Sequence, residues 1–419
     1  MTTAPQIIEE FVATEYKYGF VTDIEKSAKG IRPAPVAATR RVEPEELSRF
    51  EGEGGPEAPE QRIQGQRQPD PSTWKEIVAR YQKPAFWRGV WQVVNTLVPY
   101  AALWYLMYLS LAASWWITTA LAILAGGFLV RVFIIFHDCG HRSFFRSRKA
   151  NDIWGFITGV LTFAPYYHWR WEHALHHASS GDLDRRGTGD IWTLTVQEYL
   201  EASHWKRLAY RLSRNPVVLF VVAPLYLFMV KHRLARSQAN RRERDSVYWT
   251  NLAIFGMAAA LSWVFGIKAY LWIQLVIILV AGSAGIWLFY VQHQFEGVYW
   301  ERRAEWDYTA AALKGSSFYK LPKILQWFSG NIGFHHIHHL SPRIPNYHLE
   351  KCHKAEPLFQ SVKPVTLFSS LKSFTFHLWD EQHCKLVGYG HLRNLRRQQR
   401  KAVLRRPTGM RGIPTSNCQ

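Results

Sequence analysis

Hydrophobic residues gather along the chain into four long blocks that are separated by polar segments. The blocks cover residues 90–113, 115–136, 249–265 and 269–291. A helix needs about 20 mostly apolar residues to cross the hydrocarbon core of a bilayer, and each block reaches or approaches that length. The pattern therefore predicts an all-α integral membrane protein with four transmembrane helices.

The segments between the blocks predict which helix ends share one side of the membrane. An uncharged turn at Ser114 joins the first two blocks, whereas the segment from Lys231 to Asp245 carries six basic residues against two acidic ones. Basic flanks mark the cytoplasmic side of a spanning helix. We therefore expect the Ser114 turn outside, a hairpin at Gly266–Ala269, and cytoplasmic ends for the second and fourth spans.

Three further segments carry apolar residues without the length of a span. Residues 153–165 and 216–230 are too short to cross a bilayer, so we expect them at the surface or half-buried. Residues 72–91 mix aromatic with basic side chains, which predicts an interfacial helix that leads into the first span.

The two ends of the chain differ in composition from its centre. Residues 1–72 predict a disordered extension, because their second half is rich in Pro, Gly, Glu and Arg. Residues 13–25 alone resemble the start of the SUF-type iron–sulfur assembly scaffold; a fusion remnant, a misplaced start or chance would each explain this, and we assign it no function. Residues 392–419 form a basic tail, which leaves 73–391 as one membrane domain.

The net charge of +19 would suggest nucleic acid as the partner of a soluble protein. Here the basic residues flank the apolar blocks, where they would face anionic lipid headgroups. Nucleic-acid binding is therefore not expected. The four cysteines form no Cys-x-x-Cys pair, so a thiolate metal site is not predicted either.

Eight histidines fall into three clusters with the spacing of one helix face. The clusters are His137 and His141; His173, His176 and His177; and His335, His338 and His339. Residues at i, i+3 and i+4 of a helix point the same way, so each cluster can aim its imidazoles at one spot. Eight imidazoles exceed the four ligands of a tetrahedral zinc ion, which predicts two metal ions.

The ligand type narrows the chemistry of this site. Imidazole suits iron, copper and zinc, and many nitrogen ligands with open positions favour a redox metal over a structural one. A zinc protease would need a glutamate after its first histidine as general base. Asp138 follows His137 instead, and no glutamate precedes His141, so that class is excluded.

The histidine pattern resembles that of the integral-membrane fatty acid desaturases, over residues 72–391. Stretches 134–145, 189–192, 282–296 and 330–347 carry the likeness in detail. They are most similar to bacterial acyl-lipid desaturases of the delta-5 or omega-6 type, which act on membrane phospholipids. This resemblance implies a four-helix stem beneath a cytoplasmic helical cap that holds a di-iron centre, in a bacterial cytoplasmic membrane.

The resemblance also implies a ligand set. Members of the family carry a further ligand after the fourth span, and His293 occupies that place. The nine expected ligands are His137, His141, His173, His176, His177, His293, His335, His338 and His339. Asp138 and Asn331 are candidates to orient a ligand or a bound water, although Asn331 could equally cap a helix.

The remaining histidines are expected to be surface or structural residues. His336 sits within the third cluster but off its ligand face. The others lack a cluster partner at ligand spacing: His168, His204, His232, His348, His353, His377, His383 and His391.

The implied reaction uses O2 and two electrons to place a cis double bond in a lipid acyl chain. A dry apolar tunnel would hold that chain, with Trp169, Trp171 and Trp192 as candidate lining residues. The sequence contains neither a dinucleotide-binding Gly-x-Gly-x-x-Gly after a strand nor the His-Pro-Gly-Gly haem signature. An external ferredoxin, flavodoxin or cytochrome is therefore expected to supply electrons, docking on the basic face.

Two alternatives remain at this stage. The same iron centre could hydroxylate the acyl chain instead of desaturating it, and the sequence separates these outcomes poorly. A histidine-rich membrane metal transporter is a different class of protein. It would place polar ligands in the middle of the spans, whereas nearly all the histidines here lie at or beyond the ends of the spans.

Overall fold

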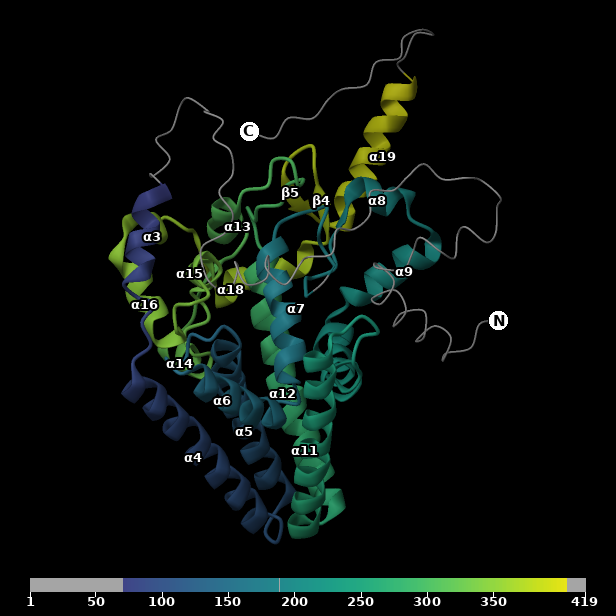
Figure 1. Ribbon diagram of the computed structural model, residues 1–419. Coiled ribbons are helices and arrows are strands. Elements are labelled where there is room, and N and C mark those ends of the chain that lie inside the picture. The colour runs from purple at the N-terminus through teal and green to yellow at the C-terminus, as the bar shows by residue number, and fades with distance from the viewer. Residues whose placement is uncertain (1–70, 188, 405–419) are drawn as a thin grey trace.

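The computed structural model describes residues 71–187 and 189–404 (Figure 1). Four helices in it are long and apolar enough to cross a membrane: α4 (Phe86–Ser110), α5 (Trp115–Gly140), α11 (Arg241–Phe265) and α12 (Ile267–His293). They form the lower half of Figure 1, and a cap of shorter elements lies above them. The predicted all-α membrane fold is thus confirmed. The segment 13–25, most of the N-terminal extension and the end of the basic tail lie outside the described residues.

The spanning helices continue beyond the apolar blocks because polar residues cap them. The side chain of Asn240 accepts a hydrogen bond from the Glu243 amide (3.0 Å), and the Glu243 carboxylate accepts one from the Asn240 amide (3.4 Å), which starts α11 several residues before its apolar block. Ser114 caps α5 through the Trp116 amide (3.2 Å). Gly266 alone separates α11 from α12, with a φ of +77° that favours glycine.

Helix α5 lies at the centre of the bundle and packs against both α4 and α12. A Cβ atom on Gly126 of α5 would lie 2.6 Å from the Cβ of Val280, so only glycine permits this close approach to α12. Leu129, Ile273 and Ile277 are buried in the same contact. The carboxyl-terminal ends of α5 and α12, where site histidines lie, are thereby held in a fixed relation.

A buried arginine joins the bundle to the cap. Arg131 of α5 donates from Nε to Oγ1 of Thr96 in α4 (3.1 Å) and from its guanidinium to the carbonyl of Trp327. The guanidinium carbon also lies 4.0 Å from the centre of the Trp327 ring, in α14 (Lys323–Phe328). A buried charge is costly unless it is fully bonded, so these contacts fix α14 against the bundle.

The cap consists of short helices and two small sheets. Its helical elements are α3 (Pro71–Ala79), α6 (Arg148–Leu161), α7 (Tyr166–Ser179), α8 (Val196–Glu201), α9 (His204–Ser213), η2 (Val218–Val222), α10 (Ala223–Met229), η3 (Lys231–Arg233), α13 (Tyr308–Lys314), α14, α15 (His335–Leu340), α16 (Asn346–Ala355), α17 (Pro357–Gln360), α18 (Leu367–Ser370), η4 (Leu371–Thr375) and α19 (Tyr389–Leu404).

The larger sheet joins segments that are distant in sequence. Strand β4 (Leu378–Asp380) pairs in parallel with β1 (Leu194–Thr195) and antiparallel with β5 (Lys385–Val387). The smaller sheet pairs β2 (Phe318–Lys320) in parallel with β3 (Pro364–Thr366). The larger sheet therefore ties the chain after α12 to the segment before α8, whereas the smaller sheet joins two segments that both follow α12.

The predicted interfacial helix over residues 72–91 is wrong. Helix α3 ends at Ala79, and α4 begins only at Phe86. Pro84 lies between them and lacks the amide hydrogen that a continuing helix needs. Trp74 and Val78 are 5% and 3% exposed because they pack in the cap, next to α16 (Figure 1), rather than on a membrane surface. Trp74 and Val78 thus serve a protein core, whereas Phe86, Trp87 and Trp91 are exposed at the start of α4.

The two shorter apolar runs form short helices. Residues 153–165 contribute to α6, and residues 216–230 form η2 and α10. His204–Ser213 and Val218–Arg233 are long and apolar enough to cross a membrane only when taken together, and they are bent by 66° at the break between them. Helix α10 packs on α12, where a Cβ on Gly282 would lie 2.7 Å from the Cβ of Pro224.

Candidate metal centre

Four elements bring the three histidine clusters and His293 together at one end of the helix bundle. The end of α5 carries His137 and His141, and the end of α12 carries His293. The other two clusters lie on α7 and α15. All nine side chains are buried or half-buried, so water does not compete freely for their nitrogens.

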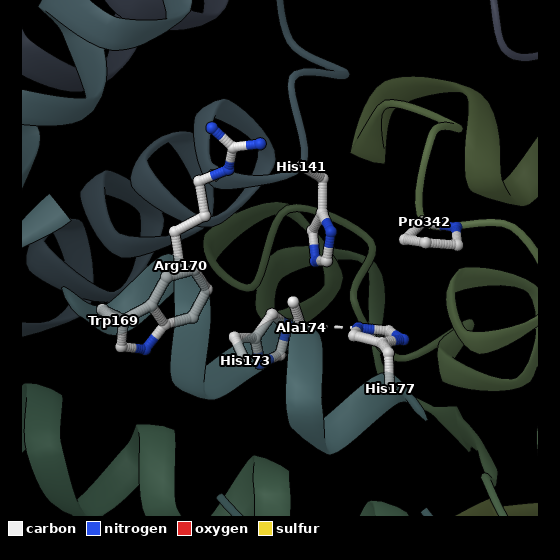
Figure 2. A pocket seen from close by; sticks show the side chains of 8 residues that line it. His141, Trp169, Arg170, His173, Ala174, His177 and Pro342 are labelled. Atoms are coloured by element: carbon white, nitrogen blue, oxygen red, sulfur yellow. Dashed lines mark hydrogen bonds between the residues drawn. The ribbon is translucent and has the colours of Figure 1, made fainter. Parts of the chain in front are cut away.

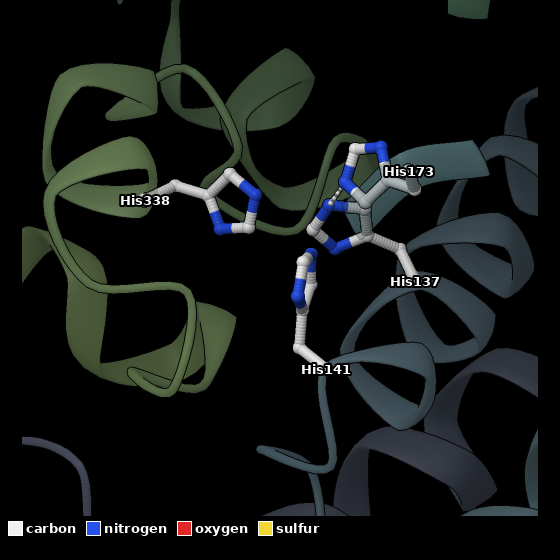
Figure 3. Close-up of side chains that lie close together, drawn as sticks. All are labelled: His137, His141, His173 and His338. Atoms are coloured by element: carbon white, nitrogen blue, oxygen red, sulfur yellow. Dashed lines mark hydrogen bonds between the residues drawn. The ribbon is translucent and has the colours of Figure 1, made fainter. Parts of the chain in front are cut away.

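The first group of imidazoles comprises His137, His141, His173 and His338, whose ligand nitrogens all lie within 4.8 Å of one another. Figure 3 shows these rings facing a common centre, with His338 opposite the other three. The Nε2 atoms of His137 and His173 are 3.1 Å apart. The Nε2 of His177 lies 3.2 Å from that of His173 and 3.0 Å from that of His338, which makes it a fifth member.

The second group comprises His176, His293, His335 and His339. The Nε2 of His293 lies 3.2 Å from that of His176 and 3.0 Å from that of His335. The Nε2 of His339 lies 3.1 Å from that of His335. The two groups adjoin, because the rings of His177 and His339 stack with their centres 4.2 Å apart.

The short nitrogen–nitrogen distances fit metal ligands better than a hydrogen-bond network. Two nitrogens that bind one ion at about 2.0–2.1 Å are separated by roughly 3.3 Å in a tetrahedral site. Burial, followed by the charges of neighbouring histidines, holds the pKa of His173, His177 and His338 well below the usual range. These rings are therefore neutral at neutral pH and keep a lone pair for a cation.

Asp138 orients one of these histidines. Its Oδ1 lies 3.0 Å from Nδ1 of His137, which leaves Nε2 of that ring free to face the centre. Its Oδ2 accepts hydrogen bonds from the backbone amide (2.6 Å) and the side-chain amide (2.8 Å) of Asn346. A carboxylate behind an imidazole fixes the tautomer and the orientation of the ring.

Asp190 makes the equivalent contact in the second group, and the sequence analysis did not single it out. Its Oδ1 lies 2.6 Å from Nδ1 of His176. The stretch 189–192 carried part of the desaturase resemblance, but no spacing rule links an aspartate to a histidine fourteen positions earlier. Gly189 has a φ of +72°, and a Cβ there would lie 3.1 Å from the Cβ of His176, so the loop approaches α7 closely.

Asn331 lies farther from the histidines than the sequence analysis suggested. Its side chain receives a hydrogen bond from Gln326 (2.7 Å) and donates one to the carbonyl of Asn346 (3.1 Å). It does not cap α15, whose preceding residue is Phe334. Asn331 thus helps to position Asn346, which in turn donates hydrogen bonds to the carboxylate of Asp138.

His336 points away from both groups, in line with its place off the ligand face. Its Nε2 lies 3.1 Å from Nδ1 of His353 and 3.2 Å from the carbonyl of Phe359. Burial lowers the pKa of His336 to about 3, so the ring is neutral. It supports packing of the cap.

A cavity of about 420 Å³ reaches the centre and extends along the bundle. Three site histidines line it, namely His137, His173 and His335. Trp169 and Trp192 line it as expected, and the Trp169 ring stacks on His173 with centres 4.4 Å apart. Trp171 is not among its lining residues in the described chain. The guanidinium of Arg236 covers the Trp171 ring at 3.5 Å, on another side of α7.

A second, water-sized pocket touches the first histidine group from another direction. Its volume is about 10 Å³, which is room for about one water molecule. Figure 2 shows it between Trp169, Arg170 and Pro342, with His141 and His177 on its walls. The centre therefore has space beside the ligands for a small molecule.

Comparison with known proteins agrees with this geometry. Residues 113–364 match the family described as fatty acid desaturase. The chain is 50% identical over 318 residues to a fatty acid desaturase of Bacillus subtilis, which covers 76% of this chain and 90% of that protein. The chain belongs to the fatty acid desaturase family. This desaturase is accordingly an oxidoreductase of a family known to use a di-iron centre.

More distant relatives carry more specific names. A Synechocystis sn-1 oleoyl-lipid 12-desaturase is 28% identical over 261 residues, covering 61% of this chain and 71% of the relative. A Synechocystis sn-1 acyl-lipid omega-3 desaturase (ferredoxin) is 26% identical over 270 residues, covering 60% and 69%. Relatives of this desaturase thus include acyl-lipid desaturases.

Replacing Asp190 by asparagine should weaken metal retention without removing a ligand. The neutral amide introduced by Asp190→Asn cannot accept the Nδ1 proton of His176 as a charged carboxylate does, and loss of such a partner lowers metal affinity about 10- to 100-fold. Iron per chain, measured by elemental analysis after gel filtration at limiting iron, checks this. Asp245→Asn is the matched control, since that carboxylate is 52% exposed on α11. Equal iron in both variants would refute the role of Asp190.

His176→Ala should abolish product formation while the protein still enters the membrane fraction. The variant loses one imidazole of the second group, so iron per chain should fall. His336→Gln is the control for burial alone, because that side chain is buried on α15 outside both groups. Wild-type activity in the His176→Ala variant would remove His176 from the ligand set.

Proposed function

We propose that this desaturase introduces a cis double bond into an acyl chain of a membrane lipid, using two iron ions, O2 and external electrons. The observation that carries the proposal is the pair of adjoining imidazole groups on the wall of a cavity that continues between membrane helices. The resemblance to relatives named as acyl-lipid desaturases supports the lipid-bound substrate.

The two imidazole groups suit two iron ions. One would be held by His137, His141, His173, His177 and His338, and the other by His176, His293, His335 and His339. When bound, the iron pair supplies the oxidising power that attack on an unactivated methylene requires. The ring orientation is set by Asp138 and Asp190, which bond the far nitrogens of two ligands.

The walls of the cavity differ along its length in a way that suits an amphipathic lipid. Leu129 and Ile278, from α5 and α12, line its apolar part within the bundle. Arg186, Lys206 and Lys231 line the part within the cap. An acyl chain would therefore occupy the bundle end, with the polar headgroup at the cap end. Phe289 also lines the cavity, and the centre of its ring lies 5.0 Å from the ring centres of both His176 and His293.

The electron donor would be an acidic ferredoxin, flavodoxin or cytochrome. Arg207, Arg211 and Arg393 line a groove of about 570 Å³ between α9 and α19, on the cap. Clustered positive charge speeds encounter with an acidic protein and fixes its orientation. The omega-3 relative is named with ferredoxin, which supports this class of donor.

The active site would face the cytoplasm of a bacterial cell. The basic stretch from Lys231 to Asp245 precedes α11 at the cap end of the bundle, and basic residues favour the cytoplasmic side.

Expression in a host that lacks the product should yield a new unsaturated fatty acid in its membrane lipids. Gas chromatography with mapping of the double-bond position measures this, and the His176→Ala variant serves as the inactive control. A hydroxy fatty acid in place of the alkene would show a hydroxylase. An unchanged lipid profile, with zinc instead of iron in the purified protein, would favour metal transport.

Gly285→Leu should reduce desaturation of long acyl chains. Gly285 lines the cavity on α12, and no described atom lies within 4 Å of a Cβ placed there, so a leucine would project into the space. Added methylenes that crowd a substrate in its pocket cost about 1–3 kcal/mol, which corresponds to a loss of about 5- to 150-fold. Product per milligram of enzyme, compared across chain lengths, measures the effect, and shorter chains should be spared.

Gly256→Leu is the matched control for that variant. Gly256 also has free space around its Cβ, but it is exposed on α11 and lies away from the cavity. Its substitution should leave the product profile unchanged. Equal profiles for both leucine variants would show that the cavity does not hold the acyl chain.

A further inference from the structure

The structure brings together two histidines that the sequence analysis treated as isolated. His383 lies in the turn between β4 and β5, and His391 lies in the first turn of α19. Both face the carboxylate of Asp380, the last residue of β4. Their separation of eight residues in the sequence did not indicate this proximity, which the hairpin and the following helix supply.

Asp380 is held in a defined orientation by its backbone neighbours. The residue is 4% exposed, and its Oδ1 accepts hydrogen bonds from the amides of Gln382 (3.1 Å) and His383 (3.3 Å). This leaves Oδ2 for the two imidazoles. Oδ2 lies 2.9 Å from Nδ1 of His383 and 3.1 Å from Nε2 of His391.

The contact of His391 is close but is not a hydrogen bond. Its Nε2 is buried and has no hydrogen-bond partner among the described residues, although Oδ2 is only 3.1 Å away. The two observations agree if the N–H direction of the ring misses the carboxylate oxygen. A buried nitrogen without a hydrogen bond is unfavourable, so this atom calls for another partner.

A metal ion would satisfy all three groups at once. One ligand atom from each of Asp380, His383 and His391 lies within 4.8 Å of the other two. Separations of 2.9 and 3.1 Å are close to the roughly 3.3 Å expected between ligands that lie about 2.0–2.1 Å from a tetrahedral ion. We propose that these three residues bind a zinc ion, with water in the fourth position, as a third metal site separate from the histidine centre.

The position of this site suggests a structural role. Strand β4 pairs with β1, which follows the loop that carries Asp190. The neighbouring Glu381 pairs with Arg302 (2.8 Å), and Arg302 also pairs with Asp184 (2.7 Å). Zinc would join the β4–β5 turn to α19 and so stabilise the sheet beside which the Asp190 loop lies.

Metal analysis of the full chain in detergent tests the proposal. Iron-loaded wild-type protein and the His383→Gln/His391→Gln double variant are equilibrated with Zn²⁺, desalted and measured for zinc and iron. We expect about one more zinc per chain in the wild type than in the double variant, with equal iron in both. His204→Gln, an exposed histidine on α9, should retain the wild-type zinc content.

Three results would overturn the proposal. The first is wild-type protein that retains no zinc after equilibration, an outcome that does not depend on how the variant folds. The second is equal zinc in wild type and double variant, which would leave Asp380 as a carboxylate bonded to two imidazoles. The third is a loss of iron in place of zinc, which would refute zinc as the occupant. Co²⁺ absorption in the visible range, present in wild type and absent in the variant, provides a second readout.

Discussion

The structure depends on one constraint: nine buried or half-buried imidazoles converge at one end of the bundle, with several ring nitrogens only 3.0–3.1 Å apart. Such an arrangement cannot be stabilised by protonation, because burial and the neighbouring rings disfavour the charged form. Its stability must therefore come from the scaffold around it and, under the proposed function, from the metal ions that the imidazoles would hold. The close packing of α5 on α12 at Gly126 and the carboxylates behind His137 and His176 supply that scaffold.

The architecture follows from this need to join distant segments. Two ligand sets lie at the ends of membrane helices, where the chain leaves the apolar phase, and two lie on short cap helices. The cavity passes the same boundary, with Leu129 and Ile278 on its wall in the bundle, Arg186 on its wall in the cap and three of the histidines along it. Under the proposed function, the acyl chain would reach the histidines from the bundle end of this cavity.

The sequence predicted those features that depend on local periodicity. The four spans follow from apolar length, and each histidine cluster follows from helical spacing. Sequence spacing does not reveal that His177 joins the first group while His176 joins the second. That division depends on how α7 packs against α15. Asp190, Asn346 and the pairing of His383 with His391 likewise arise from tertiary contacts. Helix α3 was misassigned because an amphipathic face does not say whether a lipid surface or a protein core covers it.

The contact between Arg131 and Trp327 couples the membrane helices to the cap. The guanidinium of Arg131 bonds Thr96 of α4 and the backbone of α14, so it holds the bundle and the cap together. Separation of α14 from the bundle would leave this buried charge without its hydrogen-bond partners in an apolar environment, which has a high free-energy cost. The bundle and α14 should therefore move together as one unit in any opening of the protein.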